Sequence, residues 1–460
     1  MPPEMVRWPI SEIAPKISSR EVSPVELVQA CLDGIGEIDD QLSSFITVTA
    51  DLAIEQAKQA EKEILSGSYR GALHGIPLAL KDIINTAGVR TTAGSRILAE
   101  NIPAKDAAVW QKLNQSGGVL IGKTNMHEFA RGSSTNNPHY GRCRNPWDPQ
   151  GKRIPGGSSG GSGAAVAACL CAGALGTDTL GSVRKPAADC GIVGIKPTYD
   201  LVSRQGVIPL SWSLDHVGPM ARTVRDAAIL LDHMIDADRD RLPYGILPTA
   251  DFRPKGTRIG LINGWWNARC DHEVSAAFQK ALAAFNEMGC EIKELDFADM
   301  ERIFAAGRIV SICEATTYHE PWIREHADAY GDDVRRALIG GFTIPARDYI
   351  HCLRVRSWAI DQFKALFAQA DVIASPCTME PAPAFDGIKT EKGLDIAFYT
   401  GPANLLGIPA LSVPCGFSTD GIPIGLQLMA SHYQEGLAIN LANAYEAATR
   451  WHQCRPPICA

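Results

Sequence analysis

The sequence predicts an α/β fold, in which a single large domain is built from layers of helices and strands. Short buried strands alternate with amphipathic helices through most of the chain, which is typical of layered α/β architectures. The chain has 460 residues, 45% apolar and 21% charged, so it can bury a large core. Length alone allows roughly two or three domains, but no repeat with a period of roughly 20–50 residues is visible.

The N-terminal part, about residues 1–66, is expected to form a helical layer. Its clearest signal is Ser23–Glu26 (SPVE), which combines a serine N-cap, a proline at the first helical position and a glutamate three residues after the cap. We expect a helix from there to about Ile38, a strand over Phe45–Thr49 and an amphipathic helix over Leu52–Leu65.

The next part, about residues 67–230, carries most of the residues that could perform chemistry. Its expected elements are short apolar strands and two helices: strands Gly75–Lys81, Val119–Lys123, Leu175–Thr177 and Val193–Lys196, and helices Ala107–Asn114 and Gly160–Ala172. The apolar stretch Ala164–Leu175 (AAVAACLCAGAL) is too short to span a membrane and predicts a buried core helix.

The middle of the chain, about residues 236–370, differs because long helical segments dominate it. Its expected elements are strand Arg258–Ile262, helix Val274–Met288 and strand Glu291–Leu295, followed by helices. Over about residues 371–455 the earlier pattern returns, with strands Val372–Ser375, Leu411–Pro414 and Ile424–Met429 and helix Gly436–Thr449. We therefore interpret residues 1–460 as one domain with a variable middle segment.

Charge and composition argue against several classes of partner. The formal net charge is −7 and no long basic run occurs, which disfavours binding to a phosphate backbone. Residues 1–10 lack a signal-peptide pattern, and no window of about 18 apolar residues predicts a membrane span. The thirteen cysteines have no repeated CxxC spacing and no zinc-site pattern. We expect a reduced cytoplasmic protein without a metal and without nucleic-acid or membrane partners.

Two Gly/Ser-rich stretches and one lysine form the candidate catalytic set. The stretches Gly156–Gly163 (GGSSGGSG) and Gly176–Ala187 (GTDTLGSVRKPA) supply Ser158 and Ser182, and an apolar run ends in Lys81. A nucleophilic serine needs a base, and a lysine can serve only if burial lowers its pKa. Neither stretch contains a histidine, so the three side chains together are the predicted machinery.

At these residues the chain resembles the amidase signature family. The resemblance covers most of residues 5–455 and continues through Gly122–Ser134 (GKTNMHEFARGSS), Asn145–Trp147 (NPW), Cys190–Thr198 (CGIVGIKPT), Ser213–Thr223 (SLDHVGPMART) and Gly401–Gly416 (GPANLLGIPALSVPCG). It implies a central mixed β-sheet covered by helices on both faces. It also implies a cofactor-independent hydrolase that cuts the C–N bond of an amide or carbamate.

The resemblance assigns a role to each residue of the catalytic set. Neutral Lys81 would draw a proton from Ser158, which would draw one from the nucleophile Ser182. In the family the equivalent of Ser158 follows a cis peptide bond. Ser159 is expected either to hydrogen-bond Lys81 or to cap the following helix.

The loop Thr179–Ser182 is expected to present backbone N–H groups to the reacting oxyanion, from Thr179, Leu180, Gly181 and Ser182. The family has glycine at the position of Leu180, so a leucine at positive φ would cost about 1–2 kcal/mol. Asp178 and Arg184 are expected to hold this loop. Candidate substrate-binding residues are Met126, Phe129 and Gly157.

Two motifs offer alternatives to this assignment. Gly117–Thr124 (GGVLIGKT) satisfies the phosphate-loop pattern GxxxxGK[ST], which would make the protein a nucleotide-dependent transferase using Lys123. Gly156–Gly160 (GGSSG) satisfies the GxSxG elbow, although no buried strand precedes it. His127, His139 and His216 are expected to be satisfied polar residues rather than ligands.

The sequence is compatible with two classes of substrate. In the glutaminase subunit of a tRNA-dependent amidotransferase, an acidic residue lies just before the motif matched by Thr400–Gly407. Here that place holds Ala397, Phe398 and Tyr399, with Asp395 further upstream. We therefore expect an apolar or aromatic amide or carbamate, handled by a monomer or homodimer, with four tryptophans as candidate pocket residues: Trp265, Trp266, Trp322 and Trp358. The alternative is a glutaminase subunit that needs partner chains.

Overall fold

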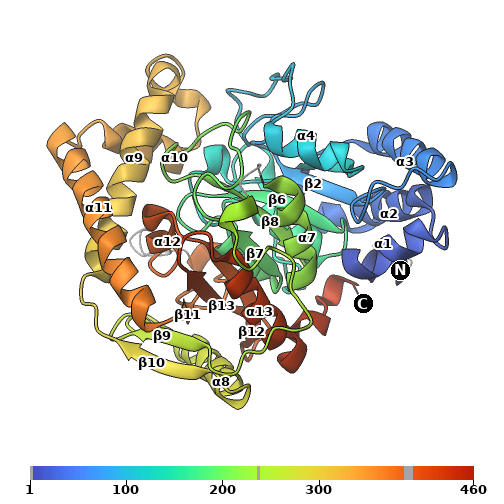
Figure 1. Cartoon of the computed structure of the whole chain (residues 1–460). Coiled ribbons are helices and arrows are strands. Elements are labelled where there is room, and N and C mark those ends of the chain that lie inside the picture. Colours follow the sequence, from blue (N-terminus) through green and yellow to red (C-terminus); the bar gives the residue numbers. More distant parts are fainter. Residues whose placement is uncertain (1–3, 236–238, 388–396, 460) are drawn as a thin grey trace.

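The computed structural model describes residues 4–235, 239–387 and 397–459 as one α/β domain with a mixed sheet at its centre (Figure 1). Within these residues the central sheet has eleven strands, in the spatial order β1 (Phe45–Val48), β3 (Val119–Thr124), β2 (Pro77–Lys81), β6 (Gly173–Asp178), β8 (His216–Ala221), β7 (Val193–Lys196), β12 (Ala410–Phe417), β13 (Pro423–Ala430), β11 (Val372–Pro376), β9 (Arg258–Ile262) and β10 (Glu291–Leu295). A small separate hairpin pairs β4 (Asn136–Asn137) with β5 (Gly141–Arg142).

The directions of the strands confirm the mixed sheet that the resemblance implied. Strand β2 is parallel to both neighbours, β3 and β6. Strand β8 is antiparallel to β6 and β7. Parallel neighbours need a crossover, and the chain between β2 and β3 includes helix α4 (Ala108–Gln115).

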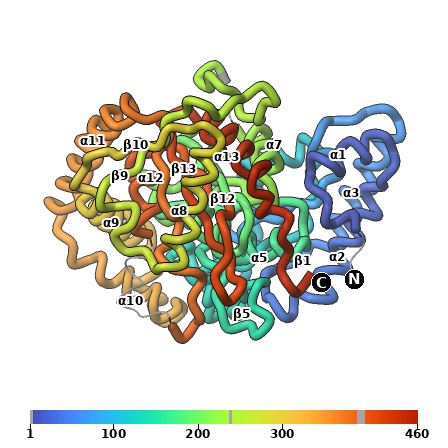
Figure 2. The backbone as a smooth tube through the Cα atoms, turned by 90° about the horizontal axis from the view of Figure 1, so that it is seen from below, coloured from blue at the N-terminus to red at the C-terminus, as the bar shows by residue number. Residues whose placement is uncertain are grey.

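Twelve further α-helices are described around the sheet: α1 (Ile10–Ser18), α2 (Pro24–Leu42), α3 (Ala50–Leu65), α5 (Gly160–Ala167), α6 (Arg184–Cys190), α7 (Val224–Met234), α8 (His272–Glu287), α9 (Met300–Glu325), α10 (Asp332–Gly341), α11 (Ala346–Gln369), α12 (Gly401–Leu406) and α13 (Glu435–Thr449). Figures 1 and 2 show α1–α3 at one end of the molecule and α9–α11 at the other. No described helix has the length and apolarity needed to cross a membrane.

Two glycines of β6 show that different helices cover the two faces of the sheet. A Cβ at Gly173 would lie 2.6 Å from Leu230 Cδ1 of α7. A Cβ at Gly176 would lie 2.8 Å from Ser159 Oγ, just before α5. Because residues three apart on a strand face opposite ways, α7 packs on one face and α5 on the other. Both positions need glycine because these helices approach the strand closely.

The N-cap predicted at Ser23 is confirmed. Its Oγ accepts hydrogen bonds from the amides of Val25 (3.1 Å) and Glu26 (3.3 Å) at the start of α2. At the other end of the chain, the guanidinium of Arg7 donates to the carbonyl of Cys459, so the two termini lie side by side (Figure 2).

The helix predicted over Gly160–Ala172 is wrong in its second half. Helix α5 ends at Ala167, and Cys169 has φ +59, which an α-helix cannot contain. The chain then enters β6 at Gly173, so the apolar stretch Ala164–Leu175 is shared between a helix and a strand. Both environments are fully buried, and an apolar run alone does not distinguish them.

Several described helices and strands had no individual prediction, among them α6, α7, β8 and α12. Helix α6 contains Pro186, which suggests a loop in the sequence. Pro186 is the third residue of the helix. At that position a backbone N–H has no acceptor within the helix, so a residue without an N–H is tolerated there.

Candidate active site

Lys81 and Ser158 meet in the interior, although 77 positions separate them in the chain. Lys81 is the last residue of β2, and Ser158 lies two residues before α5. Lys81 Nζ lies 2.7 Å from Ser158 Oγ and 2.8 Å from Thr177 Oγ1. The side chains of Lys81 and Ser158 are fully buried, and the Gly157–Ser158 peptide bond is cis.

Burial makes Lys81 a base that functions near neutral pH. Removal from solvent lowers the pKa of Lys81 to about 7, while the carboxylates of Asp215 and Asp178 act in the opposite direction. An ordinary lysine, with a pKa near 10.4, would be almost wholly protonated at pH 7. The lowered pKa makes the neutral form of Lys81, which can accept a proton, accessible near neutral pH.

Ser182 lies at the wall of a pocket of about 380 Å³, a volume typical of small-ligand sites. It is partly exposed and follows Gly181, whose φ of +126 requires glycine. Gly157 lines the same pocket, which brings the Ser158 segment and Ser182 to one place. Among the described residues, the hydroxyl of Ser182 makes no hydrogen bond, including to Ser158.

The amides of the Thr179–Ser182 loop have different partners. The N–H of Gly181 donates to Asp178 Oδ1 at 2.7 Å, so the expectation that Gly181 helps to bind an oxyanion is wrong. Within the described chain, the N–H groups of Thr179, Leu180 and Ser182 donate no hydrogen bond, and all three residues line the pocket. The strain expected at Leu180 is also absent, since its φ is not positive.

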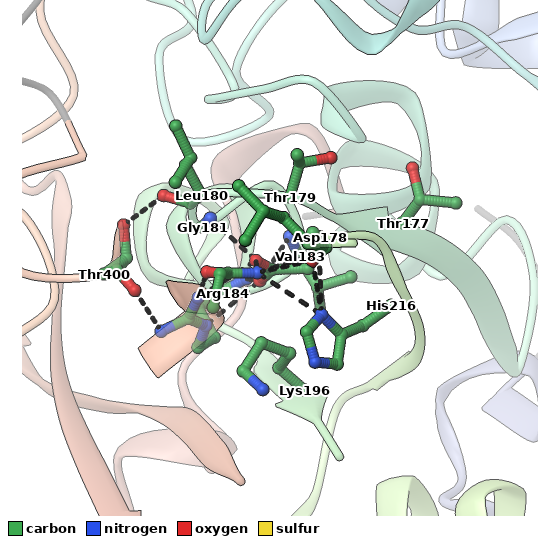
Figure 3. A network of polar contacts seen from close by, with 12 residues as sticks. Thr177, Asp178, Thr179, Leu180, Gly181, Val183, Arg184, Lys196, His216 and Thr400 are labelled. Carbon is green, nitrogen blue, oxygen red and sulfur yellow. Dashed lines mark hydrogen bonds and ion pairs between the residues drawn. The ribbon is translucent and has the colours of Figure 1, made fainter. Parts of the chain in front are cut away.

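A buried ion pair holds this loop, as expected for Asp178 and Arg184. Arg184 Nη2 donates to Asp178 Oδ1 at 2.9 Å, and Nε donates to Oδ2 at 3.0 Å (Figure 3). Val183 N also donates to Oδ2, at 3.1 Å. Burial alone would raise the pKa of Asp178, but the Arg184 guanidinium holds it well below its usual range.

Arg184 also ties the loop to the C-terminal part of the chain. It donates to the carbonyl of Thr400 at 2.9 Å (Figure 3). It also donates to Asn404 Oδ1 at 2.6 Å. Thr400 Oγ1 returns a hydrogen bond to the carbonyl of Leu180 at 2.7 Å. The loop backbone is therefore held by hydrogen bonds to two parts of the chain.

Thr177, Ser159 and Asp215 have roles that differ from the sequence-based interpretation. Thr177 was not predicted at the site, but its hydroxyl is the second acceptor for Lys81. Ser159 neither bonds Lys81 nor caps α5; its Oγ donates to the carbonyl of Thr177 at 3.2 Å. Asp215, also missed, accepts from Thr179 Oγ1 at 2.6 Å, and burial raises its pKa to about 6. Only the position of Thr177 inside the motif GTDTLGS could have signalled its role.

The three candidate substrate-binding residues lie in different places relative to the pocket. Gly157 lines the pocket, whereas Met126 and Phe129 are fully buried and do not. Phe129 stacks on Trp322 with ring centroids 5.8 Å apart, so it belongs to the packing beneath the site. The four tryptophans pack on other rings rather than lining the pocket: Trp265 on Tyr399, Trp266 on Phe278, Trp322 on Phe129 and Trp358 on Phe297.

The wall of the pocket combines apolar residues with several charged side chains. The charged and ionisable lining residues are His127, Arg131, Lys185, Arg308, Asp333 and Arg336. Ala397 and Thr400 also line the pocket, while Phe398 and Tyr399 are buried. Asp395 lies outside the described residues.

Neither alternative motif forms the structure it would need. Lys123 is buried inside strand β3, where Nζ donates to the Ile84 carbonyl and Thr91 Oγ1, both at 2.6 Å. A phosphate loop would need Lys123 at a helix start, so the nucleotide-binding reading is wrong. Likewise no strand precedes Ser158, as an elbow requires.

Each of the three histidines contacts a neighbour through one ring nitrogen, but His139 Nδ1 and His216 Nε2 are buried without a partner among the described residues. His127 Nε2 lies 2.8 Å from Asp333 Oδ2, His139 Nε2 lies 2.9 Å from Glu128 Oε1, and His216 Nδ1 lies 2.7 Å from the Leu214 carbonyl. The described chain contains no group of three or more His, Cys, Asp or Glu side chains arranged to hold a metal ion.

Comparison with known sequences agrees with this geometry. A sequence model of the family named Amidase matches residues 26–439. One glutamyl-tRNA(Gln) amidotransferase subunit, from Thermosynechococcus vestitus, is 40% identical over 483 aligned positions, covering 98% of this chain and 99% of that protein.

Solved structures give the same picture. The fold matches a chain from a vestigial protein complex connected with the evolutionary origins of an s-triazine catabolic enzyme (TM-score 0.87, 32% identity, 96% of this chain and 99% of that chain). It also matches the corresponding glutamyl-tRNA(Gln) amidotransferase subunit from Thermotoga maritima (TM-score 0.80, 33% identity, 96% and 94%). The peptide amidase of Stenotrophomonas maltophilia is similar too (TM-score 0.81, 29% identity, 98% of each chain).

Proposed function

The chain belongs to the amidase family and is a hydrolase of carbon–nitrogen bonds other than peptide bonds. From the geometry of its site, we propose that it hydrolyses a carboxamide through an acyl-enzyme on Ser182. The observation that carries the proposal is the 2.7 Å contact between Lys81 and Ser158, buried beside a pocket that Ser182 lines. Burial lowers the pKa of Lys81 to about 7, which suits a group that accepts a proton near neutral pH.

The proton path runs from the nucleophile to the lysine. Neutral Lys81 accepts the Ser158 proton while Ser158 accepts that of Ser182, and Ser182 Oγ bonds to the amide carbon. When the tetrahedral intermediate collapses, the C–N bond breaks, Ser158 delivers a proton to the departing amine, and Lys81 returns its proton to Ser158. Water then repeats the sequence, releasing the carboxylic acid and restoring Ser182.

The free amides of the loop supply the oxyanion stabilisation. Thr179, Leu180 and Ser182 carry N–H groups without acceptors in the described chain, and such donors typically contribute about 3 kcal/mol each to the transition state. The N–H of Gly181 contributes indirectly, because its bond to Asp178 fixes the loop. Pre-organised donors need no rearrangement when charge develops on the carbonyl oxygen.

The relatives support a role as an amide-hydrolysing subunit of an amidotransferase. The glutamyl-tRNA(Gln) amidotransferase subunits align over nearly the whole of both chains, which favours this role over carbamate hydrolysis. In that role the chain would release ammonia from a small amide such as glutamine and would bind partner chains.

A second candidate is a free-standing amidase. The observation that favours it is Ala397, which lines the pocket close to where the amidotransferase pattern has an acidic residue. A neutral methyl group cannot pair with the ammonium of glutamine, so that substrate loses one expected contact.

Ammonia release by the purified full chain tests the proposal. The wild type should release ammonia from at least one short amide among glutamine, glutaramate and butyramide, while Ser182→Ala should release none above background. Equal release by both proteins would refute an acyl-enzyme on Ser182. Turnover by the chain alone favours the free-standing amidase, and turnover that requires co-purified partner chains favours the subunit role.

A further inference from the structure

A buried carboxylate of the middle segment contacts the turn that precedes β8. Glu314 lies on α9 and is 1% exposed. Its Oε2 accepts hydrogen bonds from Ser211 Oγ at 2.7 Å and from Ser213 N at 3.0 Å. Its Oε1 accepts from Ser213 Oγ at 2.6 Å and from the hydroxyl of Tyr349, on α11, at 3.0 Å. Burying a carboxylate is costly unless donors surround it, so these four bonds hold the carboxylate and the turn together.

The same turn is held from its inner side by Asp215. Asp215 Oδ2 accepts hydrogen bonds from the amides of Leu210 and Ser211, both at 2.9 Å. The N–H of Asp215 donates back to the carbonyl of Ser211 at 2.8 Å. Ser211 therefore contacts both carboxylates, with its hydroxyl on Glu314 and its backbone on Asp215.

Asp215 connects this turn to the loop that carries Ser182. Its Oδ1 accepts a hydrogen bond from Thr179 Oγ1 at 2.6 Å. Thr179 lines the pocket, and its N–H has no acceptor in the described chain. Direct hydrogen bonds thus run from the helical middle segment, through Ser211 and Asp215, to a residue at the reacting centre.

We propose that Glu314 is a positioning residue of the reaction, because it holds the turn that carries Asp215 and thereby fixes Thr179. This inference rests on the proposed function, since the position of Thr179 matters for the rate only if its N–H binds the developing oxyanion. Glu314 is buried and is not part of the described pocket wall, so it acts through its neighbours. A donor that is fixed before charge develops lowers the barrier more than one that must first be reordered.

Glu314→Ala removes the acceptor of all four donors. The variant should lower kcat by about tenfold or more and change KM by less than about threefold, because the N–H of Thr179 acts in the transition state. The turn should loosen without being released, since the hydroxyl of Tyr199 still donates to the Trp212 carbonyl at 2.8 Å. The substrate is whichever of glutamine, glutaramate and butyramide the wild type hydrolyses fastest. A loss confined to KM would show that Glu314 shapes the pocket, which would overturn the inference.

Glu314→Gln should restore most of the wild-type kcat. The glutamine oxygen can accept from Ser211 and from the Ser213 amide, while its NH₂ group donates to the hydroxyls of Ser213 and Tyr349, which can rotate to accept. A glutamine variant as slow as Glu314→Ala would show that charge, and not position, is what Glu314 supplies. Glu320→Ala is the matched control, because Glu320 lies on the same helix, is 43% exposed and does not line the pocket. It should leave kcat unchanged.

A double variant tests whether Glu314 acts through Thr179. Thr179→Val keeps the shape of the side chain but removes the hydroxyl that bonds Asp215. In that background Glu314→Ala should slow kcat much less than in the wild type, because effects within one hydrogen-bond network are not additive. Thr179→Ser keeps the hydroxyl and should keep the full sensitivity to Glu314→Ala. Equal losses in the valine and serine backgrounds would contradict the inference.

A readout without turnover separates this inference from the proposed function. Labelling of Ser182 by a fluorophosphonate should slow in Glu314→Ala by about the same factor as kcat, and circular dichroism shows that the variant is folded. If Glu314→Ala does not fold, Glu314→Asp takes its place, because it draws the carboxylate back from the turn by one methylene and keeps the charge. Wild-type kcat and labelling in a folded variant of either kind would overturn the inference and leave the amidase proposal intact. A wild-type protein that neither hydrolyses the three amides nor reacts at Ser182 would defeat both together.

Discussion

Lys81 Nζ lies 2.7 Å from Ser158 Oγ at a place where neither side chain has access to bulk water. No carboxylate of the described residues forms an ion pair with this lysine, and its two hydrogen-bond acceptors, Ser158 and Thr177, are neutral hydroxyls. Desolvation therefore outweighs the more distant attraction of Asp178 and Asp215, and the pKa of Lys81 falls to about 7. Several consequences of this arrangement can be measured.

Hydrolysis should rise with pH along a limb with a midpoint near 7. Only neutral Lys81 can accept a proton, and the fraction of neutral lysine grows as pH passes its pKa of about 7. The profile of kcat/KM against pH measures this directly. Lys81→Ala should lose the limb together with most of the rate, whereas His127→Ala and His216→Ala should retain the limb. Loss of the pH dependence in one of the histidine variants would show that this histidine, and not Lys81, is the base.

Lys81→Met should stabilise the fold and flatten its dependence on pH. The unfolded chain keeps the Lys81 proton up to about pH 10.5, while the folded chain releases it near 7. The unfolded state thus binds more protons between these values, and the free energy of unfolding falls as pH is lowered from 10.5 towards 7. Urea denaturation at pH 7 and pH 9 should show a smaller difference for the variant than for the wild type. An equal or larger difference would show that Lys81 is not desolvated.

Thr177→Val should move the catalytic limb to lower pH. Thr177 Oγ1 accepts a hydrogen bond from Lys81, and this bond is stronger for the ammonium than for the amine. Its loss disfavours the charged form and should lower the midpoint by about half a pH unit, since one unit corresponds to about 1.4 kcal/mol. Ser159→Ala is the control, because Ser159 contacts the Thr177 backbone and not the lysine. A midpoint that moves in Ser159→Ala but not in Thr177→Val would contradict this reading.

Asp178→Asn should cost stability and activity together. The substitution leaves the buried guanidinium of Arg184 without its ion-pair partner, and breaking such pairs typically costs about 3–5 kcal/mol. The bond from Gly181 N–H would weaken too, loosening the loop. Asp361→Asn removes a carboxylate from an exposed pair with Lys364 and should change stability by less than about 1 kcal/mol. Similar denaturation midpoints for both variants would show that the buried pair does not hold the fold.

Local patterns predicted much of the fold. The cap at Ser23, most strands and the amphipathic helices follow from signals within a few residues, and the expected mixed sheet is present. The boundary between helix and strand was predicted wrongly where the chain is buried on all sides. In the segment that ends α5 and begins β6, helix and strand are equally apolar, and only the left-handed turn at Cys169 separates them.

The site was predictable in its residues but not in its surroundings. Lys81, Ser158 and Ser182 stand out by type and motif, whereas the bond from Gly181 to Asp178 depends on a loop geometry that spacing does not encode. The charged pocket wall was missed for a similar reason. Arg308 and Arg336 come from the helical middle segment, and only the tertiary fold brings them to the catalytic loop.

The most direct test of the central claim is to locate a covalent label. A fluorophosphonate should modify Ser182 alone in peptide mass mapping, because Ser182 is the nucleophile in the proposed mechanism. Lys81→Ala and Ser158→Ala should slow labelling by at least about 100-fold, the usual contribution of general-base assistance. Labelling at Ser158 instead, or an unchanged labelling rate in Lys81→Ala, would contradict the account.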